Sequence, residues 1–185
     1  LMRVCALPSQ PLKAIRLADE APCEFPVLAV EELMAGKLKA MIERSHPRDL
    51  YDLYTFSQAG IDHDREMLTK LTVLFSSTLP RDLRSYTPER YDRVQTADVE
   101  KLLYPLLRSG DRPAPEDMTA AVRPLLVAVL DHAKEKAYLD AIARGEYRPE
   151  LLFPSRPDIV DRIARHPAML WKAANVAEHL SKRSE

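Results

Sequence analysis

The fold of this chain is decided by EELMAGKLKA, residues 31–40, and by PRDLYDLY, residues 47–54. Both stretches repeat apolar residues at the three- and four-residue spacing typical of helices that bury one face. At about 100° per residue, a helix over residues 30–44 gathers five apolar residues on one face. They are Val30, Leu33, Met34, Leu38 and Met41. The second stretch predicts another helix close behind the first.

Lys37 lies within this apolar face, whereas Lys39 is expected to point towards solvent. An unpaired buried ammonium is costly, so Lys37 must extend to the protein edge, change its pKa or contact an anion. Asp49 and Asp52 are three residues apart, so both lie on one side of the following helix and offer carboxylates. A lysine that leaves the core at an edge, and acids that complement a helix dipole, are the structural alternatives.

Composition excludes some classes of protein. Lys and Arg total 27 against 28 Asp and Glu, so no broad basic field exists and any nucleic-acid contact must be a local patch. Cys5 and Cys23 lack metal-ligand spacing, and we interpret them as a reduced, cytosolic pair rather than a disulfide. No apolar run approaches about 18 residues, and no signal peptide is recognised. We therefore expect a cytoplasmic protein without membrane contact.

From residue 29 the pattern is helical almost to the end. We predict helices over about 30–44, 46–60, 63–77, 96–108, 116–144, 155–165 and 167–182. Ser45 is the expected cap of the second helix, Pro47 lies in its first turn, and Pro124 is a candidate kink in the long one. Residues 13–17 predict one strand, for which the chain offers almost no partner. The fold class is mainly α: a helical bundle with a short N-terminal extended remnant.

Two further clusters leave alternatives open. Arg81, Arg84, Arg90 and Arg93 interleave with Tyr86 and Tyr91, which is typical of either a phosphate-backbone patch or a solvated loop with balancing acids. In the C-terminal part, Trp171 indicates core packing, with a docking surface as the alternative.

The spacing Glu31-x5-Lys37, followed by RDLYDL at 48–53, resembles the AbiEii/AbiGii toxin family of nucleotidyltransferases, within the polymerase-beta-like superfamily. The resemblance continues in PELLF at 149–153 and HPAMLWK at 166–172. It implies a toxin of a toxin–antitoxin or abortive-infection system that uses Mg²⁺ and a nucleoside triphosphate. It also implies an RNA acceptor, as some family members modify the 3′ end of tRNA, and a winged-helix antitoxin as partner.

The same resemblance assigns roles to four residues. Lys37 looks like the family's nucleotide-phosphate lysine, with Arg48 as a second nucleotide-binding group. Asp49 looks like the downstream catalytic acid, and Asp52 is the second acid of that motif. The resemblance assigns no metal ligand within this chain.

The family's Gly-Ser and Asp-x-Asp motifs should both precede Lys37, yet no glycine precedes Gly36 and Asp19 is the only earlier aspartate. We therefore expect the C-terminal part of such a protein, or a shortened relative. On this interpretation residues 1–60 are the remnant of a nucleotidyltransferase-like catalytic domain, and residues 61–185 form a helical domain. The alternative function is a non-catalytic helical module that binds an antitoxin or RNA. A purely structural helical domain is a weaker third interpretation.

Overall fold

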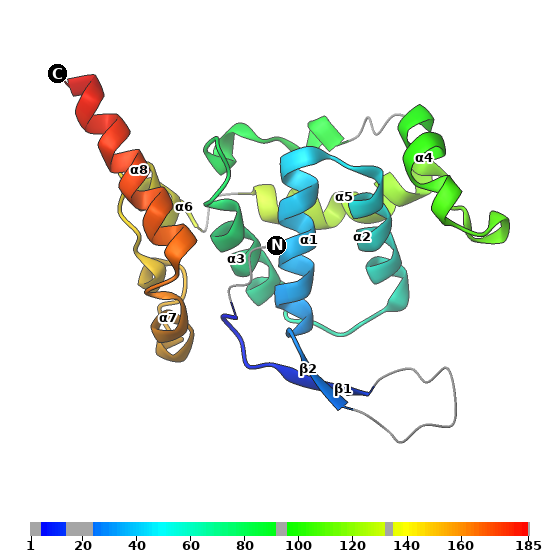
Figure 1. Ribbon diagram of the computed structural model, residues 1–185, viewed down its shortest axis with the longest axis horizontal. Coiled ribbons are helices and arrows are strands. Elements are labelled where there is room, and N and C mark those ends of the chain that lie inside the picture. Colours follow the sequence, from blue (N-terminus) through cyan, green and yellow to red (C-terminus); the bar gives the residue numbers. More distant parts are fainter. Residues whose placement is uncertain (1–4, 14–23, 92–95, 132–134, 185) are drawn as a thin grey trace.

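The computed structural model describes residues 5–13, 24–91, 96–131 and 135–184. Eight α-helices and a two-stranded sheet lie within these ranges (Figure 1), which confirms the mainly α prediction. The helices are α1 Val30–Arg44, α2 Pro47–Ala59, α3 Arg65–Ser76, α4 Thr96–Leu102, α5 Pro115–Leu130, α6 Lys136–Ala143, α7 Pro157–Ile163 and α8 Pro167–Ser184. The strands are β1 Gln10–Lys13 and β2 Glu24–Val27.

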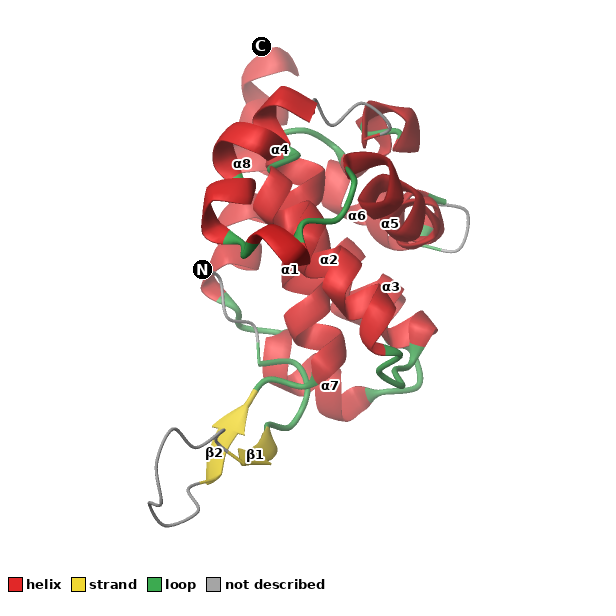
Figure 2. Cartoon of the chain, turned by 90° about the vertical axis from the view of Figure 1, so that its right-hand side faces the viewer, coloured by secondary structure: helices red, strands yellow, loops and turns green. Residues whose placement is uncertain are grey.

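The N-terminal strands correct one expectation. Residues 14–17 of the predicted strand lie outside the described residues, but β1 does have a partner, because β2 pairs with it antiparallel. Pro11 faces Pro26 across this ribbon. A proline is tolerated in an edge strand, where its missing N–H need not face the partner. Figure 2 shows the hairpin projecting from the helices.

The helix α1 is the centre of the fold. It packs against α3 on one side and α2 on the other, while α5 contacts both α2 and α3 (Figure 1). One hydrophobic core extends from Ala6 to Met169 and therefore includes residues on both sides of position 60. The division into parts 1–60 and 61–185 stays a prediction.

The buried face of α1 is rotated from the face that the sequence indicated. Leu33 is 49 % exposed. The buried apolar residues are Met34, Ala35, Leu38, Met41 and Ile42. Because α1 packs between two helices, its buried face centres on Leu38, and Lys37 lies at the margin of that face. Lys37 is also the more exposed of the two lysines, with 39 % of its side chain exposed against 24 % for Lys39.

A tight turn joins α1 to α2. Ser45 ends α1 in the left-handed conformation, at φ 51°, and its N–H donates to Met41 O. His46, not Ser45, caps α2, because its Nδ1 accepts the N–H of Arg48 at 3.2 Å. The expected cap was therefore wrong by one residue, while Pro47 does begin the helix. This turn brings the last turn of α1 beside the first turn of α2.

The expected long helix over 116–144 is two helices, α5 and α6. Pro124 lies inside α5, and the chain leaves the helix at Asp131 instead. Tyr138 of α6 is fully buried and accepts a hydrogen bond from Ser77 Oγ at 3.0 Å. This hydrogen bond joins α6 to the residue that follows α3, so α6 does not continue along the axis of α5.

The last helix, α8, contacts α6 and carries an exposed aromatic residue. Trp171 is 67 % exposed, so its interpretation as a core residue was wrong. Met169 and Ala173, two residues before and after it and so on the opposite side of the helix, are buried. The indole therefore lies on the outward side of α8.

Candidate functional site

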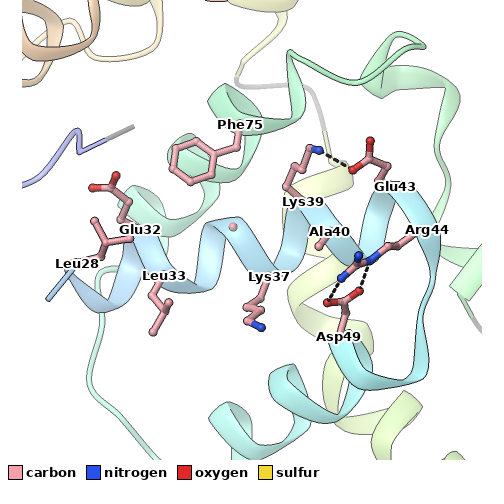
Figure 3. A pocket seen from close by; sticks show the side chains of 11 residues that line it. Leu28, Glu32, Leu33, Lys37, Lys39, Ala40, Glu43, Arg44, Asp49 and Phe75 are labelled. Atoms are coloured by element: carbon pink, nitrogen blue, oxygen red, sulfur yellow. Dashed lines mark hydrogen bonds and ion pairs between the residues drawn. The ribbon is translucent and has the colours of Figure 1, made fainter. Parts of the chain in front are cut away.

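A hollow of about 350 Å³ runs along the outer face of α1 (Figure 3). Gly36 and Ala40 line it, and neither carries a side chain large enough to fill it. Phe75 of α3 lies on one side and Asp49 of α2 on the other. The remaining lining residues are Leu28, Glu32, Leu33, Lys37, Lys39, Glu43 and Arg44. The hollow therefore has small and apolar residues at its base and charged side chains along both margins.

Lys37 contacts an anion, which is one of the three outcomes that the sequence left open. Its Nζ lies 2.6 Å from Asp52 Oδ2, and the two side chains are 39 % and 43 % exposed. The partner is Asp52, one turn further along α2 than Asp49. An exposed ion pair of this kind contributes about 0–1 kcal/mol, so a more strongly charged ligand can replace the carboxylate.

Asp49 pairs with Arg44 instead. Arg44 Nε donates to Oδ2 at 2.7 Å and Nη2 donates to Oδ1 at 2.9 Å, which is a bidentate contact. The Asp49 side chain is only 3 % exposed. The hydrogen bonds to Asp49 raise the pKa of Arg44 above its ordinary value, so this guanidinium stays charged. Both carboxylate oxygens of Asp49 are therefore held at the edge of the hollow.

Arg48 is exposed on the first turn of α2, and its backbone N–H is taken by the His46 cap. Within the part of the chain that the structure describes, it does not line the hollow. Of the four residues predicted for the site, Lys37 and Asp49 line the hollow, and Asp52 is joined to it through Lys37.

Sequence reasoning missed Glu32 and Arg44. Glu32 is a carboxylate on α1, yet it is only 1 % exposed. Its Oε2 accepts the N–H of Leu7 at 3.2 Å, and its buried Oε1 has no hydrogen-bond partner among the described residues. One sequence signal could have indicated Glu32. It lies four residues before Gly36, so both are on the same side of the helix, where the glycine leaves space beside the carboxylate.

The described residues do not by themselves fit a magnesium site. Among them, no group of three or more His, Cys, Asp or Glu side chains converges on one point. Asp49 gives both oxygens to Arg44, and Asp52 contacts Lys37. Mg²⁺ favours several oxygen ligands around one point, which these two paired acids do not supply.

The arginine cluster fits a charge-balanced loop. Arg84 is paired with both Asp82 and Asp140, at 2.6 Å each. Tyr91 is buried and donates to Ile42 O, so its ring is not available for stacking on a base. Arg90 lies over the ring of Tyr86, and Arg93 is outside the described residues.

A family model matches most of the chain. The family model described as "Nucleotidyl transferase AbiEii toxin, Type IV TA system" matches residues 3–151. The chain belongs to the AbiEii family. This family consists of nucleotidyl-transferase toxins of toxin–antitoxin systems, so the resemblance noted at Lys37 and residues 48–53 is confirmed. No curated protein and no solved structure shows significant similarity to the chain.

The AbiEii match runs from the N-terminal hairpin to the turn after α6 and includes the whole hollow. It ends before α7 and α8, and thus before the HPAMLWK stretch at 166–172. None of the helices that the structure describes is long and apolar enough to cross a lipid bilayer.

Proposed function

We propose that the hollow on α1 binds the phosphates of a nucleoside triphosphate, and that the chain takes part in nucleotide transfer to an RNA acceptor, with tRNA as the acceptor to test first. The observation that carries this proposal is the position of Lys37. Lys37 lines a hollow of about 350 Å³, and among the described residues its ammonium pairs with one half-exposed carboxylate, that of Asp52. A lysine held in this way is a point charge suited to a phosphate.

The charge of a triphosphate favours its replacing Asp52 as the ion-pair partner of Lys37. A triphosphate carries several negative charges, whereas Asp52 carries one. Because the Lys37–Asp52 pair is half exposed, breaking it costs little. Asp52 would then be released beside the bound phosphates, where it can act as the acid of the site. Asp49, fixed by Arg44, keeps its place at the edge of the hollow.

The proposal also covers a second phosphate contact, the metal ion, the partner protein and the location. Arg48, exposed on α2, is a candidate for a second phosphate contact once a longer ligand extends beyond the hollow. Mg²⁺ is the metal that the family resemblance implies, but the described acids do not form its site, and we assign it no residue here. A winged-helix antitoxin is the proposed partner, and the cytoplasm, where tRNA and nucleotides occur, is the proposed location.

The test uses the purified chain, bulk tRNA, Mg²⁺ and each of four labelled nucleoside triphosphates. Nucleotide affinity is measured in parallel by calorimetry. We expect Lys37→Ala to weaken nucleotide binding about 10- to 100-fold, the range for losing a charge-assisted hydrogen bond. The matched control is Lys182→Ala, which removes another ion-paired lysine, on α8. Unchanged affinity in Lys37→Ala would contradict the proposal.

The second candidate is a non-catalytic helical module that binds RNA or an antitoxin. It is favoured by the pairing of both predicted acids within the described residues, Asp49 with Arg44 and Asp52 with Lys37. Label that appears on tRNA with the wild-type chain and disappears in Lys37→Ala would exclude it. Nucleotide binding without any transfer would support it.

A further inference from the structure

Glu32 is a buried carboxylate that lines the hollow without a function in phosphate binding. A negative charge would repel phosphates, so Glu32 requires a separate explanation. Its Oε2 accepts the Leu7 N–H, whereas Oε1 has no hydrogen-bond partner in the described part of the chain. Buried acceptors in folded proteins are nearly always paired. An N–H donor of a bound ligand would complete this pairing.

The hollow separates this acceptor from the cations. Glu32 and Lys37 are five residues apart on α1, or about 7.5 Å along the helix axis. Their side chains point to opposite sides of α1 (Figure 3), and Gly36 lies between them in the sequence. A nucleotide has the same polarity, since its sugar separates an anionic phosphate chain from a base with N–H donors. The spacing therefore suits one nucleotide lying across α1.

The wall near Glu32 is apolar. Leu28 and Leu33 line this end of the hollow, and Phe75 forms its side. A Cβ added at Gly36 would lie 4.0 Å from Phe75 Cε2, so the space beside the ring is left open by the missing side chain. A flat base can use such a surface, because its faces are apolar and its edge carries the polar groups.

We propose that Glu32 reads the base of the nucleotide bound at Lys37 and selects bases that carry an exocyclic amino group, namely cytosine, adenine and guanine, over uracil. This inference rests on the proposed function and adds a specificity residue to it. A carboxylate accepts hydrogen bonds from an amino group such as cytosine N4. Uracil has no amino group, and its single N–H, at N3, lies between two carbonyl oxygens that a carboxylate would repel.

A cationic side chain of a partner protein is the main competitor for Glu32. It fits less well, because it would pair with Glu32 alone and leave Lys37, which lines the same hollow, without a ligand. A nucleotide satisfies both kinds of group at once, the base at Glu32 and the phosphates at the cations. The hollow therefore favours a nucleotide.

The experiment measures the dissociation constants of CTP, ATP, GTP and UTP by calorimetry for the wild type and Glu32→Gln. The wild type is expected to bind the three amino-bearing nucleotides at least about tenfold more tightly than UTP, the effect of one hydrogen bond to a charged group. Glu32→Gln should remove most of that preference, since an amide can donate to uracil. Glu43→Gln is the control, because Glu43 lines the same hollow but is paired with Lys39. It should keep the preference.

A second measurement needs no variant and remains valid if Glu32→Gln does not fold. Dimethylation of N4 in CTP, or of N6 in ATP, removes the donors that Glu32 would accept. The wild type should bind these analogues about as weakly as UTP. Equal binding of all four ordinary nucleotides would overturn the inference, leave Lys37 as the phosphate site and point to a cationic partner group at Glu32. Failure to bind any of them would overturn the proposed function as well.

Discussion

Arg44 holds Asp49 through two parallel hydrogen bonds, Nε to Oδ2 at 2.7 Å and Nη2 to Oδ1 at 2.9 Å. This pair joins the last turn of α1 to the first turn of α2. Since the Asp49 carboxylate is 3 % exposed, it has little access to water as a substitute partner. We expect Arg44→Gln to lower the free energy of unfolding by about 1–3 kcal/mol, the cost of leaving a buried acceptor unpaired.

A double-mutant cycle with Asp49→Asn, followed by urea denaturation at neutral pH, measures the coupling. The half-exposed Lys37–Asp52 pair provides the comparison, and there the coupling should stay below about 1 kcal/mol. Equal coupling in the two pairs would contradict the structural role assigned to Arg44.

Gly36→Ala should separate stability from binding. Gly36 is inside α1, where alanine is favoured over glycine by about 0.8–1 kcal/mol, and the added Cβ meets Phe75 only at 4.0 Å. The free energy of unfolding should therefore rise. Nucleotide affinity should fall, because the methyl group occupies part of the hollow. Thermal denaturation and calorimetry on one sample measure both effects, and a variant with unchanged affinity would place the nucleotide elsewhere.

Gly145→Ala should loosen the contact between α6 and α8. Gly145 has a φ of +79°, and a Cβ there would lie 2.7 Å from Ala177 N. Such an overlap forces a backbone shift, so we expect a loss of about 1–3 kcal/mol, as for overpacking. The matched controls are Gly60→Ala, with positive φ but open space, and Gly110→Ala, with open space and no positive φ. The expected order of destabilisation, measured by chemical denaturation, is Gly145, Gly60, Gly110.

Alkaline unfolding should depend on buried tyrosines. Burial raises the pKa of Tyr91 to about 12 and also raises the pKa of Tyr138 and Tyr147. A phenol with a higher pKa in the folded state contributes its full stability below the unfolded pKa, about 10, and loses it as pH rises towards the folded pKa. The free energy of unfolding should therefore decline from about pH 10 to 12. Burial of Lys172 lowers its pKa and acts in the opposite direction up to its ordinary value of 10.5, so the decline is clearest above that pH.

Tyr91→Phe tests this origin. At neutral pH the variant should lose about 1 kcal/mol, because Tyr91 donates to Ile42 O at 2.9 Å. Above pH 10.5 its stability should fall less steeply than that of the wild type, as measured by urea titrations at several pH values. A parallel decline in both proteins would assign the alkaline transition to other groups.

The first three helices could be predicted from the sequence because local signals agree there. Apolar periodicity defines α1, Pro47 begins α2, and Asp64 caps α3 by accepting the Met67 N–H. The break between α5 and α6 could not be predicted, since it depends on where Tyr138 is buried. The strand pairing was missed because β2 contains Pro26, and proline is disfavoured in most strands, whereas an edge strand accepts it.

The candidate site was predicted only in part. An anion at Lys37 was one of three alternatives that the sequence left open, and the sequence offered two acids on one side of the next helix. It could not choose between them, because the choice depends on Arg44, which takes Asp49 and leaves Asp52 to Lys37. Glu32 was missed because its burial depends on the chain around Leu7, which lies far from it in sequence.

Trp171 is the only tryptophan of the chain, and its indole is mostly in water. Its fluorescence should therefore be red-shifted in the native protein and change little on denaturation, so circular dichroism of the helices is the better measure of unfolding. The same property makes the indole a built-in optical reporter for α8. A molecule that covers this helix would shift the emission to shorter wavelength and protect it from iodide quenching, without any added label.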